Sequence, residues 1–233
     1  MKYPLKLSVK IALVALLTSC ATPKPQTPSL DQTRWQNVYP YGQAEFINGT
    51  IELISTDNWF YLTKQSYRDF ELELDVKMPD TTEYSNSGII FRAQIKPFES
   101  GHGFYAYGYQ AEVDPSDRKW SGGLYEQATQ RQWLYPLHPT RSAPDSDFKQ
   151  NLLGEWSSQQ ANAYQHLAWN HYKIKAVGPE IKIWVNGVLT THVIDNKSAE
   201  GFIGIQHHGS ELFKKTGDKR NKVVFKNITI TEL

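Results

Sequence analysis

The sequence predicts an all-β protein whose strands form a sandwich or jelly roll. Apolar and polar residues alternate along many short runs, which is typical of strands with one buried face. Turn signals separate neighbouring runs, the strongest being Asn186-Gly187. No stretch shows the repeat of a long amphipathic helix, and residues 162–169 are expected to form a turn or two of helix at most. Many short strands without alternating helices favour a two-layered β fold.

The N-terminus has the features of an export signal followed by a lipid anchor. Three lysines among the first ten residues precede the apolar stretch 11–17, which is too short to span a bilayer. The sequence Leu17-Thr-Ser-Cys20 resembles the bacterial lipobox, in which the cysteine receives lipid and becomes the mature N-terminus. The expected organisation is a signal peptide (1–19), a lipidated cysteine with a proline-rich tether (20–33) and one domain (34–233).

The lipobox also predicts an address in the bacterial cell envelope. Cys20 is the only cysteine, so its lipidation leaves no thiol for a disulfide. Ala21 stands where a retention signal for the inner membrane would place an aspartate. We therefore expect an outer-membrane lipoprotein that faces the periplasm and contacts the membrane through its N-terminal lipid.

Composition and motifs exclude several classes of partner and cofactor. The chain has 25 Lys+Arg against 24 Asp+Glu, a net charge of +1, which argues against a nucleic-acid partner. No glycine-rich loop is suited to cradle phosphate, and the histidines lack the spacing of a zinc site. We therefore expect no nucleotide cofactor and no zinc.

The period-two runs can be followed in order along the chain. The expected strands are 70–77, 87–95, 107–114, 122–127, 172–177, 181–185, 202–208 and 223–231. Gly178-Pro179 supplies the turn of a hairpin. The stretch 136–165 lacks strong periodicity and is expected to be a long loop near one edge.

The run 107–117 is the most informative part of the sequence. Its tyrosine, alanine and valine side chains point to one side of the expected strand, while Gln110, Glu112 and Asp114 point to the other. Residues i and i+2 of a strand lie about 7 Å apart, close enough for two carboxylates to address one polar ligand. Such a strand is typical of the floor of a wet cleft.

The same alternation places further polar side chains on the cleft side of other strands. The expected cleft residues are Arg92, Gln110, Glu112, Asp114, Gln206 and His208. A second group suits sugar recognition, because flat rings pack on the apolar faces of pyranoses while charged groups bind hydroxyls. Its members are Arg118, Trp120, Tyr125, Glu126, Arg131 and Trp133. A bulge in any strand would invert part of this assignment.

Seven segments occur in an order and spacing that resemble one known family. They are Asn86-Ser-Gly-Ile-Ile-Phe-Arg92, Gly108-Tyr-Gln-Ala-Glu-Val-Asp114, Trp120-Ser-Gly-Gly-Leu-Tyr125, Trp169-Asn-His-Tyr172, Trp184-Val-Asn-Gly187, Gly204-Ile-Gln-His-His-Gly209 and Phe225-Lys-Asn-Ile228. Together they resemble the 3-keto-disaccharide hydrolase domain family, from about Trp35 to the C-terminus. The resemblance implies a concanavalin A-like jelly roll of two antiparallel sheets. Many relatives carry Glu at position 110 with Gln at position 112, and Asp at position 207.

The resemblance implies a hydrolase that acts on glycosides oxidised at C3. A ketone at C3 acidifies the proton on C2, so a base can remove it, the C1 substituent can leave by elimination, and water can add back. The enolate needs a cation or a hydrogen-bond donor. The hypothesis assigns Glu112 as base, Arg92 as the stabilising charge and His208 as acid or orienting group, with Gln110, Asp114, Gln206 and Arg131 holding hydroxyls.

The residues themselves leave other functions open. Glu112-Val-Asp114-Pro-Ser-Asp117 partly fits the Glu-x-Asp-x-x-Glu signature of retaining β-glucanases, which need two carboxyl groups about 5 Å apart. The same aromatic and acidic groups would serve a non-catalytic, lectin-like carbohydrate-binding lipoprotein. Asp114 and Asp117 could instead cap a turn or hold a calcium ion.

Overall fold

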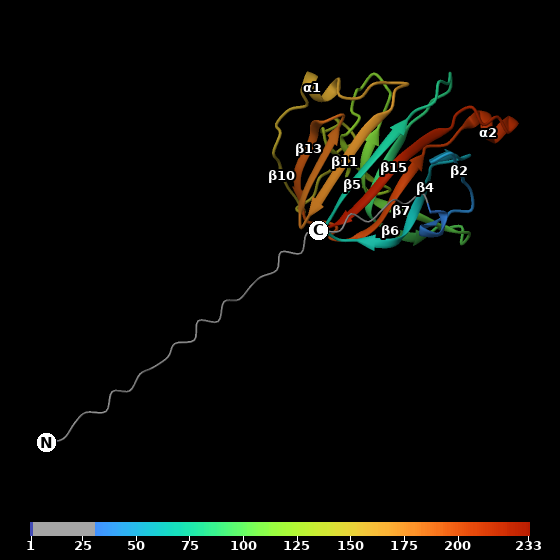
Figure 1. Cartoon of the computed structure of the whole chain (residues 1–233). Coiled ribbons are helices and arrows are strands. Elements are labelled where there is room, and N and C mark those ends of the chain that lie inside the picture. Colours follow the sequence, from blue (N-terminus) through green and yellow to red (C-terminus); the bar gives the residue numbers. More distant parts are fainter. Residues whose placement is uncertain (2–30) are drawn as a thin grey trace.

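The computed structural model of this protein describes residues 31–233, together with Met1. In this part of the chain two antiparallel sheets form the sandwich (Figure 1). The expected signal peptide, Cys20 and most of the expected tether lie outside the described residues. No described helix is both long and apolar enough to cross a membrane.

One sheet has seven strands, and its chain segments come from distant parts of the sequence. In spatial order it contains β1 (Trp35–Gln36), β4 (Trp59–Tyr67), β14 (Gly201–His207), β6 (Ser87–Pro97), β7 (Phe104–Val113), β8 (Leu124–Gln127) and β9 (Gln132–Tyr135). All of its pairings are antiparallel. This arrangement brings β14, near the C-terminus, beside β6, and β7 lies on the other side of β6.

The second sheet has eight strands and packs against one face of the first. Its spatial order is β10 (Phe148–Asn151), β13 (Val188–Asp195), β12 (Glu180–Val185), β11 (Asn170–Val177), β5 (Phe70–Lys77), β15 (Val223–Glu232), β3 (Thr50–Ile54) and β2 (Gln43–Ile47). The strands β11, β5 and β15 lie side by side in Figure 1, and β13 lies on the far side of β12 from β11. Three short helices, η1 (Gln32–Arg34), α1 (Ser158–Ala161) and α2 (Glu211–Thr216), lie outside the sheets.

The core lies between the sheets and is built by alternation. Every second residue of β5 from Phe70 to Val76 is buried, as the sequence predicts. On β7 the side chains of Tyr109, Ala111 and Val113 belong to the core. Because neighbouring residues of a strand point to opposite faces, Gln110 and Glu112 project from the outer face of the seven-stranded sheet. The predicted all-β sandwich of two antiparallel sheets is confirmed.

The secondary-structure prediction omits the strands β1, β2, β3, β4, β9 and β13, and it is wrong in two further parts. The stretch 136–165 contains β10 and α1, and the helical turn lies before residue 162 rather than within 162–169. Helix α1 begins with a capping box between Ser157 and Gln160, and α2 is capped by Ser210. Both helices are short, so their periodicity is weak and only the capping residues could have revealed them.

Candidate functional site

A polar cavity of about 240 Å³ opens on the outer face of the seven-stranded sheet. Seven residues that the sequence placed in the site line this cavity: Gln110, Glu112, Arg118, Tyr125, Trp133, Gln206 and His208. Strands β7, β8, β9 and β14 therefore meet at one hollow. Strand alternation predicted this convergence for Gln110, Glu112, Gln206 and His208, while Arg118, Tyr125 and Trp133 were expected from their suitability for sugar binding.

Three side-chain amides form a chain of hydrogen bonds across the floor. Gln110 donates through Nε2 to Oε1 of Glu112 at 2.7 Å and to Oε1 of Gln206 at 3.3 Å. Gln206 donates in turn to Oδ1 of Asn58 at 2.7 Å. Gly88, opposite Glu112 on β6, makes this packing possible, since a Cβ there would lie 2.6 Å from Nε2 of Gln110.

Two buried polar atoms of the lining residues have no hydrogen-bond partner within the described chain. They are Oε1 of Gln110, an acceptor, and Nε1 of Trp133, a donor. Both residues are about 2% exposed. Buried polar groups are almost always paired, so these two atoms have hydrogen-bonding capacity beside the cavity that the described residues do not use.

Glu112 has an unusual environment for a carboxylate. It is 5% exposed, and burial raises its pKa to about 8, with the negative charge of Asp114 adding to the effect. A hydrogen bond from Asn86 and the charges of Arg118 and Arg141 act in the opposite direction. At neutral pH the group therefore carries a proton and can donate it.

His208 follows β14 and stands at the rim of the same cavity. Its side chain is exposed by surface area, but the cavity walls limit its solvation and lower its pKa, while the charge of Asp114 raises it. The ring makes an edge contact with Tyr84, with centroids 5.3 Å apart. Its imidazole is therefore neutral at pH 7 and can accept a proton.

The adjacent His207 has a structural role. It is 1% exposed and faces the opposite side of β14, as alternation predicts. Its Nε2 donates to the carbonyl of Asn221 at 2.7 Å, and its Nδ1 accepts from the N–H of Gly209 at 3.0 Å. These bonds fix the neutral ring and hold the backbone that presents His208.

Asp114 and Trp120 support the site without lining the cavity. Asp114 is 1% exposed and pairs with Arg118 at 2.8 Å. This pair holds the Arg118 guanidinium 5.3 Å from the ring centroid of Trp133, and Trp120 packs edge-on against Trp133 at 4.8 Å. The hypothesis that Asp114 and Trp120 contact the sugar is therefore corrected: they position Arg118 and Trp133.

Arg92 is the largest error of the sequence prediction. Its side chain is fully buried and donates to the carbonyls of Arg68, Gly178 and Ser198 and to the carboxylate of Asp69. These partners lie in turns and loops between strands, so Arg92 ties chain segments together. It does not line the cavity and cannot stabilise charge there.

The cause of this error is a bulge in β6. The register between β6 and β7 shifts between Phe91 and Gln94, and Arg92 has a φ of 48°. A bulge adds a residue to one strand and reverses the alternation beyond it. The side chain of Arg92 therefore leaves the face predicted from Ile90.

Glu126 and Arg131 are also placed wrongly by the sequence prediction. Arg131 forms a bidentate pair with Glu126 at 2.7 and 2.8 Å and a second pair with Asp195 at 2.8 Å. Asp195 ends β13 in the other sheet and also accepts from the hydroxyl of Tyr109 at 2.5 Å. The cluster is buried between the sheets, so it joins the two layers and does not bind sugar.

The arrangement does not provide the two carboxyl groups that a retaining glucanase needs. Among the described lining residues Glu112 is the single carboxylate of the cavity, because Asp114 is paired behind it and Asp117 is exposed. Over residues 31–233 no group of three His, Cys, Asp or Glu side chains could hold a metal ion. The calcium ion considered from the sequence therefore stays a prediction, and the described residues provide no such group of ligands for it.

Five lining residues were missed by the sequence analysis: Asn58, Tyr84, Asn86, Gln127 and Arg141. Alternation along β8 places Gln127 on the side of Tyr125, so this residue carried a usable signal. Arg141 lies in the stretch read as a loop and is brought close by the bridge between Gln132 and Ser142. No local pattern predicts that pairing.

Solved structures with a similar fold include carbohydrate-related proteins. The carbohydrate-binding module CBM66 from Bacillus subtilis is 18% identical, covers 85% of this chain and 96% of its own, and has a TM-score of 0.54. A candidate glycosyl hydrolase from Parabacteroides distasonis is 16% identical, covers 86% of this chain and 89% of its own, and has a TM-score of 0.50. These likenesses show the shared fold.

The fold and the polar cavity define a jelly-roll protein of the glycoside-hydrolase-like or carbohydrate-binding class. Within that class, residues 28–231 match the family described as a 3-keto-alpha-glucoside-1,2-lyase-like domain, and the chain belongs to this family. A comparison with curated proteins finds no match.

Proposed function

We propose that this protein cleaves 3-keto-glycosides by eliminating the C1 substituent and then adding water. The observation that carries the proposal is one cavity that holds two titratable groups with oppositely shifted pKa values, Glu112 raised and His208 lowered. Environments that push two pKa values apart are typical of acid–base pairs. Membership of the family supports the same chemistry.

The pKa shifts favour roles opposite to those assigned from the sequence. Neutral His208 accepts the C2 proton, and protonated Glu112 donates to the departing oxygen on C1. The backbones that carry them are two strands apart, about 10 Å, because β6 lies between β7 and β14. A single sugar ring fits between two side chains that converge across this spacing.

The negative charge on the C3 oxygen requires a partner other than Arg92. Arg118 and Arg141 both line the cavity, and Nε1 of Trp133 is a donor with no partner in the described chain. Arg118 is the better placed cation, because its pair with Asp114 fixes its orientation. These donors stabilise the enolate before the C1–O bond breaks.

The atoms balance over the complete cycle. The electron pair of the C2–H bond first forms the C2–C3 double bond of the enolate, which places negative charge on the C3 oxygen. The C3 carbonyl then re-forms as the C1–C2 double bond forms and the C1–O bond breaks, and the leaving oxygen takes the proton of Glu112. Water then adds its oxygen to C1, the proton held by His208 returns to C2, and the second proton of the water restores Glu112. The net reaction is hydrolysis, and the sugar keeps its ketone.

The test follows both bond cleavage and proton exchange. Residues 31–233 are incubated in D₂O with a 3-keto-disaccharide and with its unoxidised parent. We expect sugar release only from the oxidised substrate, with deuterium at C2 of the 3-keto product above the level found without protein. Release from the parent without C2 deuterium would show direct glycosidic hydrolysis, and binding without release would show a carbohydrate-binding protein.

Two variants with matched controls connect this activity to the cavity. Glu112→Gln and His208→Gln should each lower kcat by about 100-fold or more. Exposed residues of the same types, as in Glu155→Gln and His102→Gln, should leave kcat unchanged. Equal losses in the exposed controls, or no loss at Glu112, would contradict the assignment.

We also propose that the protein is attached to the outer membrane through a lipid on Cys20, as the lipobox suggests. In a bacterial host, the wild-type chain should fractionate with the outer membrane and incorporate labelled fatty acid. Cys20→Ser should abolish the label and release the protein from the membrane fraction. Label that persists in the variant would place the modification elsewhere.

A further inference from the structure

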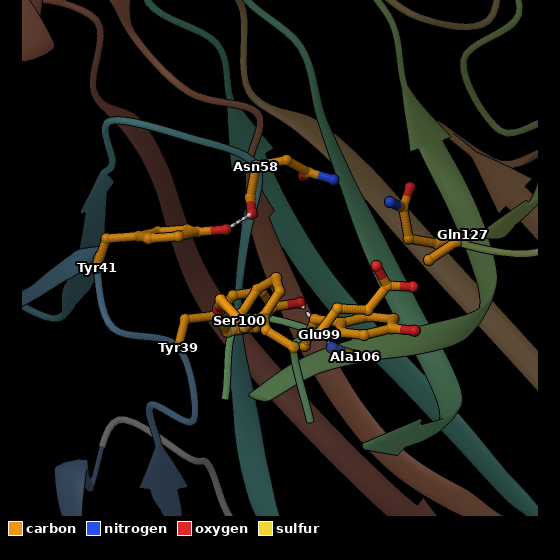
Figure 2. A pocket seen from close by; sticks show the side chains of 10 residues that line it. Tyr39, Tyr41, Asn58, Glu99, Ser100, Ala106 and Gln127 are labelled. Atoms are coloured by element: carbon orange, nitrogen blue, oxygen red, sulfur yellow. Dashed lines mark hydrogen bonds between the residues drawn. The ribbon is translucent and has the colours of Figure 1, made fainter. Parts of the chain in front are cut away.

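A second and larger cavity, of about 580 Å³, adjoins the polar cavity on the same face of the molecule. The two cavities share Asn58 and Gln127 in their walls. Figure 2 shows the second cavity, with Tyr39, Tyr41 and Asn58 on one side and Glu99 and Gln127 on the other. A ligand that extends beyond the polar cavity therefore enters this space.

The second cavity is lined by aromatic rings that contact one another. The ring centroid of Phe98 lies 5.2 Å from that of Tyr105, 6.0 Å from that of Tyr39 and 6.5 Å from that of Tyr41. The ring centroids of Tyr39 and Tyr41 are 5.6 Å apart. Tyr39, Tyr41, Phe98 and Tyr105 all line the cavity. Three of them are only partly buried, so their rings are available to pack on a ligand.

The rings of Tyr39, Tyr41, Phe98 and Tyr105 form an aromatic platform. This platform is held in place by hydrogen bonds within the protein. Asn37 accepts from the backbone N–H of Tyr39 at 2.9 Å and from Nε1 of Trp59 at 2.8 Å, and it donates to the carbonyl of Tyr41 at 2.9 Å. The hydroxyl of Tyr41 donates to the carbonyl of Asn58 at 3.2 Å. Because these rings are already ordered, little conformational entropy is lost from them when a ligand binds.

Polar groups lie beside the rings. The carboxylate of Glu99, the hydroxyl of Ser100 and the amide of Gln127 belong to the same cavity. Aromatic faces with flanking hydrogen-bonding groups match a pyranose, which has apolar faces and hydroxyls at its edge. A purely apolar ring would use the platform but would leave Glu99 and Gln127 without partners.

The order of residues along β7 gives the second cavity its direction. Tyr105 and Ala106 line the second cavity, Gln110 and Glu112 follow in the polar cavity, and His208 lies beyond them beside Asn86. Measured along β7, the proposed acid thus lies closer to Tyr105 and Ala106 than the proposed base does. A substituent on C1 whose oxygen receives the proton of Glu112 would therefore extend along β7 toward the aromatic rings.

We infer that the second cavity is the binding site for the leaving-group sugar, so that the protein prefers disaccharides to simple alkyl glycosides. This inference rests on the proposed cleavage of 3-keto-glycosides. Tyr41 and Phe98 pack on the second pyranose, and Glu99 and Gln127 bind its hydroxyls.

The test compares three 3-keto-glucosides that differ in the leaving group: glucose, methanol and phenol. In Tyr41→Ala, the ratio of kcat/KM for the disaccharide to that for the methyl glycoside should fall about five- to tenfold, the value of one lost ring contact. Tyr41→Phe keeps the ring and should keep the ratio. Tyr107→Ala removes a ring on the same strand that lines neither cavity and should also keep it.

Glu99→Ala separates a sugar site from a merely apolar one. It should lower kcat/KM for the disaccharide several-fold and leave the phenyl glycoside unchanged. An equal loss for both substrates, or a loss with Tyr41→Ala that is the same for all three substrates, would overturn the inference.

Binding measurements distinguish failure of this inference from failure of the proposed function. If no substrate is cleaved by the wild type, calorimetry with the unoxidised disaccharide and with methyl glucoside still tests the second site. Tighter binding of the disaccharide that Tyr41→Ala abolishes supports the site in a non-catalytic protein. Equal affinity of the two ligands for the wild type overturns it.

Discussion

Gln110 and Glu112 lie on the same face of β7, with Nε2 of Gln110 2.7 Å from Oε1 of Glu112. The same carboxyl group also receives a hydrogen bond from the side chain of Asn86. These amides hold the carboxyl group in place, while burial raises its pKa and favours the protonated form at neutral pH. The pair is therefore one functional unit.

The first prediction exchanges the two members of this pair. Glu112→Gln alone should lower kcat on a 3-keto-disaccharide by about 100-fold or more, because the acid is lost. The double variant Gln110→Glu/Glu112→Gln keeps one acid and one amide on neighbouring positions of the same face of β7. It should recover at least tenfold of the loss in steady-state assays. A double variant as inactive as Glu112→Gln would show that the position of the acid is fixed.

The second prediction concerns the pH dependence of stability. The pKa of Glu112 is raised to about 8 in the folded state from 4.5. Between these values the folded state binds more protons than the unfolded state, so the free energy of unfolding falls as pH rises. The stabilisation is complete below pH 4.5 and lost above pH 8, up to about 5 kcal/mol. Denaturant titrations of wild type and Glu112→Gln should show this slope only in the wild type.

The third prediction concerns acid destabilisation by His207. Burial lowers its pKa to about 4 from 6.5, since its neutral ring bridges Asn221 and Gly209. The unfolded state binds more protons in this range, so stability is present above pH 6.5 and lost as pH falls through 4, by about 3 kcal/mol. The slope should appear in Glu112→Gln, where the opposing titration is absent, and vanish when His207→Gln is added. Its persistence in that double variant would assign it to another group.

Strand alternation predicted the elements of this fold best where one face of a strand is buried. β5 is such a strand, and its apolar residues are buried as the sequence indicates. The method also placed Gln110 and Glu112 correctly, because β7 is regular over that segment. Arg92 was misplaced because the alternation of apolar and polar residues does not reveal the bulge at which Arg92 adopts a positive φ.

Other parts of the site depend on pairings between distant segments. Arg141 reaches the cavity through a single bridge, and Asn58 reaches it because Gln206, far along the chain, donates to its side chain. The buried cluster of Arg131, Glu126 and Asp195 has the composition of a binding site, and only the position of Asp195 in the other sheet shows that it is internal. The residue types show that these side chains are charged, but they do not show on which face of the sheet each side chain lies.

The fourth prediction separates Arg92 from catalysis. Arg92→Met removes the donors to the carbonyls of Arg68, Gly178 and Ser198 from a fully buried position, which should lower the free energy of unfolding by about 3 kcal/mol. Arg92→Lys supplies fewer donors and should be intermediate, because an ammonium group cannot reproduce a planar guanidinium.

Arg68→Met is the matched control for Arg92, since the Arg68 side chain is 64% exposed and pairs with Glu200 at the surface. Its loss should change stability by less than about 1 kcal/mol. Well below its midpoint of unfolding, Arg92→Met should keep the kcat of the wild type on a 3-keto-disaccharide, because the nearest consequence of the substitution is at turns outside the cavity. The contrary outcome would be a folded Arg92→Met variant, as judged by circular dichroism, whose kcat is as low as that of Glu112→Gln. That result would show that Arg92 affects the reaction, and that its hydrogen bonds to the turns also determine the shape of the cavity.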